Sequence, residues 1–221
     1  KLTNTPFKKL HMFKDMDARP WTSHREELLE WYDYWLKDMK NGALDGPACI
    51  VETGGGDVLE LDNWPPRDES LMGTKTFYLG QKGKLLPQFR HDLNVDEPDS
   101  FLQRPFYVSE ERGKLIYRSA PLTEDVQLAG SPILKFYASL DQKDTTWRVD
   151  LFEGGHQSPW PITKSWLRAA LRKRVPEEDT PWQIKHDYTV CDYPEPGEIY
   201  EYEIQLRPTA HCFKAGSCIG I

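Results

Sequence analysis

The side chains that most often bind metals or activate water are sparse and scattered in this sequence. It has six histidines and four cysteines, with no C-x-x-C motif and no histidine pair at zinc-ligand spacing. Asp141, Asp144 and Asp150 do not match a calcium-binding loop. The glycines at 54–56 precede Asp57 rather than a helix, which argues against a phosphate cradle. We therefore expect no metal, no cofactor and four free thiols.

No serine lies in a nucleophile motif. Hydrolases often place the reactive serine in G-x-S-x-G, on a sharp turn between a strand and a helix. The two Gly-Ser pairs, at Ser131 and Ser217, are followed by proline and cysteine and lack the second glycine. The sequence therefore encodes no recognisable activated serine.

The composition limits the partners that the chain can have. Its 221 residues include 28 basic and 35 acidic side chains, for a net charge of −7. That balance argues against nucleic acid or an anionic membrane as a partner. No apolar run approaches the ~18 residues of a membrane helix. Free cysteines and the lack of an N-x-S/T acceptor site favour a cytoplasmic location. We interpret Lys1 and Ile221 as the two ends of a fragment of a longer protein.

The N-terminal 43 residues predict one strand and one helix. Residues 7–13 have the pattern of a strand. Ser23 and Glu26 form a capping-box pair, so a helix should begin near His24 and end at Asn41-Gly42. One face of that helix carries an apolar stripe at helical spacing: Leu28, Trp31, Tyr32, Trp35, Leu36 and Met39. A β-α unit is too small to be a domain, so we expect the stripe to pack on protein outside the C-terminal region.

After residue 43 the pattern changes to short β-type runs separated by Gly and Pro. Polar and apolar residues alternate at 133–140, 147–151 and 200–206, which predicts an antiparallel β-sandwich. Residues 164–174 contain good helix formers and, on propensity alone, fit a helix as well as a strand.

Five segments in order resemble the CocE/NonD hydrolases, the family of cocaine esterase and X-Pro dipeptidyl-peptidase. EWYDYWLK at 30–37 resembles the last helix of the catalytic domain, and NWPP at 63–66 resembles the family's Trp-Pro turn. SAPLTEDVQLAG at 119–130 resembles the entry to the jelly roll, and DTTW at 144–147 a strand start. PGEIY at 196–200 and PTAHCFKAG at 208–216 resemble the family's late signature.

This resemblance implies a mainly β fold. Residues 1–43 would be the last β-strand and α-helix of an α/β-hydrolase catalytic domain. Residues 44–221 would be a jelly-roll β-sandwich of the galactose-binding type, truncated at its C-terminus. The family also places a strand near Trp166, so 164–172 is expected to be at least partly strand.

The resemblance implies acyl transfer to water by a Ser-His-Asp triad. The nucleophile and the acid would lie upstream of Lys1, so this chain alone should be inactive. The histidine comes last in the family's order, and two residues qualify by position: His24 and His11. Either is a candidate for the triad histidine, and loss of the triad is a third reading.

Three functions therefore remain open. In the first, the chain is part of a hydrolase like an esterase or an X-Pro dipeptidyl-peptidase, and its sandwich shapes the active-site mouth. In the second, it is a free-standing module that binds a glycan or a peptide. In the third, it is a catalytically inactive subunit kept for assembly. The first predicts a small ester or peptide substrate bound through the parent catalytic domain. A homo-oligomer is compatible with all three.

Overall fold

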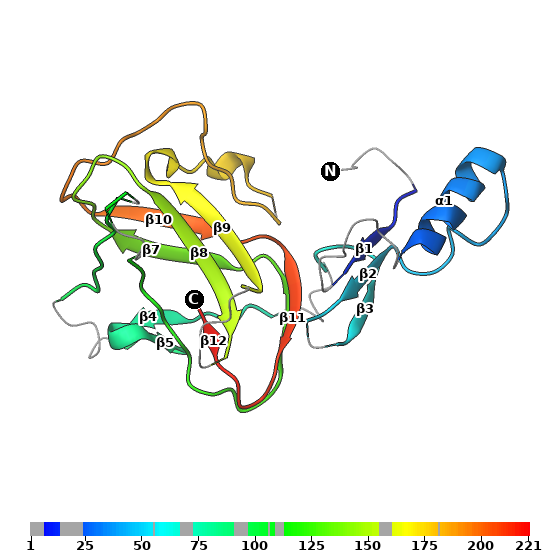
Figure 1. Cartoon of the computed structure of the whole chain (residues 1–221), viewed down its shortest axis with the longest axis horizontal. Coiled ribbons are helices and arrows are strands. Elements are labelled where there is room, and N and C mark those ends of the chain that lie inside the picture. The colour runs from blue at the N-terminus through cyan, green and yellow to red at the C-terminus, as the bar shows by residue number, and fades with distance from the viewer. Residues whose placement is uncertain are drawn as a thin grey trace.

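The chain forms two regions, a small sheet with one helix near the N-terminus and a larger body of β-strands (Figure 1). The computed structural model describes residues 7–13, 24–54, 56–66, 73–90, 97–105, 107–108, 113–154, 161–180 and 182–221. No helix in these ranges is long and apolar enough to cross a membrane.

The first region is a three-stranded sheet with a crossover helix. Strand β1 (Leu10–Met12) pairs in parallel with β2 (Cys49–Glu52), and β2 pairs antiparallel with β3 (Val58–Leu61). A parallel pair requires a crossover, which helix α1 (Arg25–Lys37) provides. The sheet therefore extends across the boundary expected at residues 43 and 44, which itself stays a prediction.

Helix α1 begins as expected but ends early. His24 is its N-cap, while Ser23 of the expected capping box lies outside the described residues. The helix ends at Asp38, not at Asn41-Gly42 as the sequence suggested. Asp38 adopts the left-handed conformation with φ 54°, and its amide and that of Met39 both donate to the Asp33 carbonyl. A short Asp side chain tolerates this conformation, so the helix stops without a glycine.

The larger body is built from nested antiparallel pairs. Strand β6 pairs with β11, β7 pairs with β10, and β8 pairs with β9, so each pair encloses the next one along the chain. This nested pairing is the scheme of a jelly roll. The short β12 adds to β8, and β4 pairs with β5. The mainly β prediction is confirmed. The strands are β4 (Tyr78–Gly80), β5 (Lys84–Leu86), β6 (Val126–Gly130), β7 (Ile133–Ala138), β8 (Thr146–Glu153), β9 (Thr163–Arg168), β10 (Tyr200–Gln205), β11 (Thr209–Phe213) and β12 (Ile219–Gly220).

The core lies between these pairs and follows the period-two pattern. Tyr202 and Ile204 on β10 and Val149 on β8 are buried. The rings of Phe136, Trp147 and Tyr202 pack together, with centroids 5.2 to 5.4 Å apart. Aromatic clusters of this kind bury much apolar area, which is the dominant favourable term in folding.

The ambiguous segment at 164–174 begins as a strand, as the family resemblance implied. Strand β9 ends at Arg168, and helix propensity is expressed only in the single 3-10 turn Ala169–Leu171. Both Ala169 and Ala170 are buried, and the Asp144 carboxylate accepts a hydrogen bond from the Ala170 amide at 3.0 Å. Pairing with β8 therefore overrides local propensity. The described residues also form 3-10 turns at Gln81–Gly83 and Pro176–Glu178.

Candidate functional site

An open cavity of about 540 Å³ lies between β1, α1 and the loop that follows the helix. Both candidate histidines line it: His11 comes from β1, and His24 caps the helix. The ring of Phe13 lies between them, 4.0 Å from the His11 centroid and 4.9 Å from that of His24. The β-α unit therefore brings together two residues that are 13 positions apart in the sequence.

His11 uses both ring nitrogens. Its Nδ1 lies 3.0 Å from Glu27 Oε2 on the helix, and its Nε2 lies 3.3 Å from Glu52 Oε1 on β2. A neutral imidazole has one N–H, so His11 donates to both carboxylates only as the imidazolium. The side chain connects β1, α1 and β2.

His24 sits at the start of the helix, half-buried at the edge of the same cavity. The roles of His24 and His11 as triad histidine stay predictions. Charged residues also line the cavity, including Lys9, Glu30 and Asp45.

The apolar stripe of α1 is uncovered within the described residues. None of the helix's residues is buried, and Trp35 and Leu36 are 44% and 77% exposed. The Trp35 ring packs against the rings of Phe7, at 5.7 Å, and of Trp31, at 5.9 Å between centroids. An exposed apolar surface of this kind normally marks an interaction site.

A second group of catalytic-type side chains was not anticipated from the sequence. On the sandwich, the Glu153 carboxylate lies between His211 Nε2, at 2.7 Å, and the Ser217 hydroxyl, at 2.6 Å. The Lys214 amide donates to the same carboxylate at 2.9 Å. Burial alone would raise the pKa of Glu153, but these hydrogen bonds outweigh it and lower the pKa below its ordinary value.

This group cannot act as a triad. In a Ser-His-Asp triad the serine hydroxyl bonds to the histidine, which in turn bonds to the acid. Here the Ser217 hydroxyl donates directly to the acid and the histidine lies on the other side of it. The group instead ties the end of β8 to β11 and to the loop before β12. Its only sequence signal is the late family signature that contains His211.

The described residues contain no group of three or more His, Cys, Asp or Glu side chains placed to hold a metal ion. All four cysteines are free thiols, two of them buried.

Solved structures share the fold at low sequence identity. A CocE/NonD family hydrolase from Staphylococcus aureus superimposes with a TM-score of 0.74 at 17% identity, over 96% of this chain and 40% of that chain. An aminopeptidase from a marine sediment archaeon of the Thaumarchaeota gives 0.63 at 20% identity, over 89% and 35%. An α-amino acid ester hydrolase gives 0.66 at 18%, over 93% and 38%. The fold is thus that of a sheet-rich part of such hydrolases.

Residues 31–221 match the family described as the X-Pro dipeptidyl-peptidase C-terminal non-catalytic domain. Because the match spans most of the chain, the chain belongs to this family. Proteins of Bacillus anthracis and Bacillus cereus named "Putative Xaa-Pro dipeptidyl-peptidase" are 25% and 26% identical over 87% of the chain. The chain spans about a third of their length, 31% and 32%. The resemblance seen in the sequence is confirmed.

Proposed function

We propose that the chain is the C-terminal part of a serine hydrolase that cleaves ester or peptide bonds, with the triad serine and acid supplied by residues outside it. The observation that carries this proposal is the histidine-lined cavity between β1 and α1, next to the uncovered stripe of the helix. An upstream catalytic domain that covers the stripe would also face the cavity.

Within this proposal, His24 is the triad histidine and His11 has a structural role. A general base needs one nitrogen for the serine and one for the acid that orients it. Both nitrogens of His11 are already occupied, by Glu27 on α1 and by Glu52 on β2. His24 stands at the start of the helix on the same cavity.

The sandwich supports this site without taking part in the chemistry. It contacts the first sheet at the turn between β2 and β3, where Gly54 lies against His211. Through this contact the sandwich would fix the position of the β-α unit and shape the mouth of the active site. The relatives' names support an Xaa-Pro peptide as one substrate class and an ester as the other.

The test uses the full-length protein with an ester, p-nitrophenyl acetate, and a peptide-type substrate, Ala-Pro-p-nitroanilide. His24→Ala should lower kcat by a factor of about 10³ or more, because loss of a triad member removes most of the catalytic power. His11→Gln is the matched control, since it lines the same cavity and should mainly lower the melting temperature. If His11→Gln abolishes turnover and His24→Ala does not, the roles are reversed. If neither variant changes kcat, the hydrolase proposal for this site fails.

A further inference from the structure

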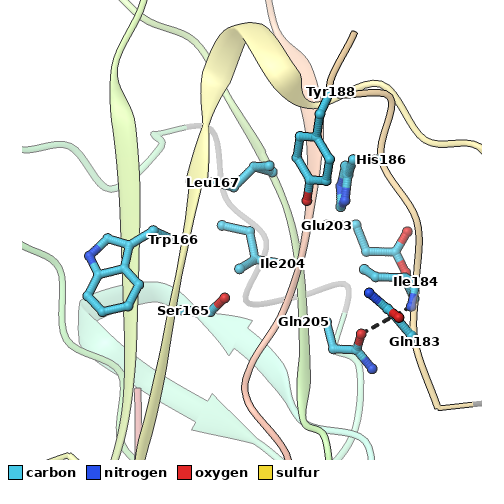
Figure 2. A pocket seen from close by; sticks show the side chains of 10 residues that line it. All are labelled: Ser165, Trp166, Leu167, Gln183, Ile184, His186, Tyr188, Glu203, Ile204 and Gln205. Carbon is cyan, nitrogen blue, oxygen red and sulfur yellow. Dashed lines mark hydrogen bonds between the residues drawn. The ribbon is translucent and has the colours of Figure 1, made fainter. Parts of the chain in front are cut away.

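The outer face of the β8–β9 pair carries an exposed tryptophan. Side chains alternate along β9, so Ser165 and Leu167 point into a cavity of about 130 Å³ beside β10, while the Trp166 indole points to the opposite side (Figure 2). Trp166 is 45% exposed, and the strand register places it opposite Arg148 on β8. Tryptophan is highly buried on average, so an indole this open on a sheet face is a candidate contact site.

Three cationic side chains surround this indole. The charged groups of Lys164 and Arg207 lie 5.6 Å from its ring centroid, and that of Arg148 lies 6.0 Å away. Lys164 is on the same face of β9, and Arg207 comes from the turn between β10 and β11. Cations at this distance are attracted to the face of the ring. We call these four side chains the Trp166 patch.

The patch carries more positive than negative charge. The Arg148 guanidinium is paired with Asp150 through two hydrogen bonds of 2.9 and 2.8 Å. Asp150 also lies opposite Lys164 in the register, but no ion pair joins them. Among the residues that the structure describes, no carboxylate pairs with Lys164 or Arg207. Their charged groups are no more than twice 5.6 Å apart, so they repel each other.

We propose that the Trp166 patch binds an acidic peptide segment of a partner protein, with one carboxylate on Lys164 and a second on Arg207. A bound anion relieves the repulsion between the two cations. Two acidic residues two positions apart on an extended segment are roughly 7 Å apart, within the span of Lys164 and Arg207. Trp and Arg are also enriched at protein–protein interfaces, where an indole supplies the apolar contact.

Other anionic partners fit the patch less well. A sugar ring stacks on an open aromatic face, but here cations already lie over the indole. A long polyanion, such as an acidic polysaccharide or a nucleic acid, would extend beyond the patch. It would then meet the surface of a chain whose net charge is −7, which repels it. A short acidic segment stays within the patch.

The test is a titration of the full-length protein, labelled with ¹⁵N-tryptophan, with the peptide acetyl-Gly-Glu-Gly-Glu-Gly-amide. The indole resonance of Trp166, assigned by its loss in Trp166→Phe, should shift in a saturable way. The half-saturation concentration should rise when the salt concentration is raised from about 50 mM to about 500 mM, because exposed ion pairs are screened. The peptide with Gln in place of both Glu is the matched ligand control and should give no saturable shift.

Charge reversal tests the two cations separately. Lys164→Glu and Arg207→Glu should each raise the half-saturation concentration about fivefold or more, since each replaces an attraction by a repulsion. Lys143→Glu, at an exposed position between β7 and β8, makes the same change in net charge and should bind like the wild type.

Three results would overturn the proposal. The first is no saturable shift of the Trp166 resonance, or an equal shift with the Gln peptide. The second is equal binding by Lys164→Glu, Arg207→Glu and the Lys143→Glu control. The third is a stronger response to oligoglucuronate than to the acidic peptide, which would make the patch a site for an acidic glycan.

Discussion

His211 occupies the space in which Gly54 lacks a side chain. A Cβ on Gly54 would lie 2.2 Å from His211 Nδ1 and 2.8 Å from Cε1, far inside contact distance. Gly54 lies in the turn between β2 and β3, and His211 lies on β11, so this contact joins the first sheet to the sandwich. The other ring nitrogen of His211 is held by Glu153 at 2.7 Å, which leaves the imidazole little freedom to move.

Gly54→Ala should therefore destabilise the protein by about 1–3 kcal/mol, the usual cost of forcing an extra methyl into a packed site. Gly73→Ala is the matched control, because no atom of the described residues lies within 4 Å of its Cβ position. It should change stability by roughly 0.5 kcal/mol or less. Urea unfolding of the full-length protein measures both. If the two variants unfold at the same urea concentration, His211 does not constrain the turn.

The hydrogen bonds to Glu153 should make part of the stability depend on pH. The pKa of Glu153 is lowered in the folded state, so its contribution is present above its ordinary pKa of 4.5 and is lost as the pH falls through the folded value. Glu153→Gln should cost about 1–3 kcal/mol at pH 7. The difference from wild type should shrink below about pH 4.5.

Urea unfolding from pH 7 to pH 3 measures this effect. Glu198→Gln, at an exposed position, is the control and should follow the wild type throughout. A Glu153→Gln deficit that is unchanged at pH 3 would mean that the carboxylate charge does not contribute.

The stripe on α1 should be buried in the full-length protein. Trp35→Ala should then cost on the order of 3–5 kcal/mol, as for a large side chain removed from a packed core. Lys40→Ala, just beyond the C-terminal end of the helix, should change stability by roughly 0.5 kcal/mol or less. Thermal unfolding of the full-length protein is the measurement. A melting temperature unaltered by Trp35→Ala would show that no upstream domain covers this helix.

The chain 1–221 alone should not react with a fluorophosphonate probe. It has no G-x-S-x-G motif, and the Ser217 hydroxyl donates to the Glu153 carboxylate rather than to a histidine. Mass spectrometry after incubation should find the unmodified chain, while the full-length protein should be labelled once. Labelling of Ser217 in the isolated chain would contradict this reading of the site.

The strand pattern was predictable because alternation reports which face of a strand is buried. Tyr202 and Ile204 on β10 and Val149 on β8 lie in the core as that alternation requires. The stop of α1 was misplaced because Asp38, a residue with moderate tolerance for the left-handed conformation, ends the helix before the stronger Asn-Gly signal is reached.

From the sequence, only those candidate site residues could be named that lie near one another along the chain. His11 and His24 were accessible because both lie near the crossover helix of one β-α unit. The Glu153–His211–Ser217 group joins positions 58 and 64 residues apart, and no local pattern predicts such contacts.

The nested pairing of the sandwich has a consequence for how the chain folds. The β8–β9 pair is the most local, and forming it shortens the loop that must close before β7 can meet β10, and then β6 can meet β11. The strands should therefore assemble from the inside outward, at a rate limited by these distant pairings. During synthesis, β6 cannot pair with β11 until residue 213 has been made. Until then the nascent chain exposes the unpaired edge of β6.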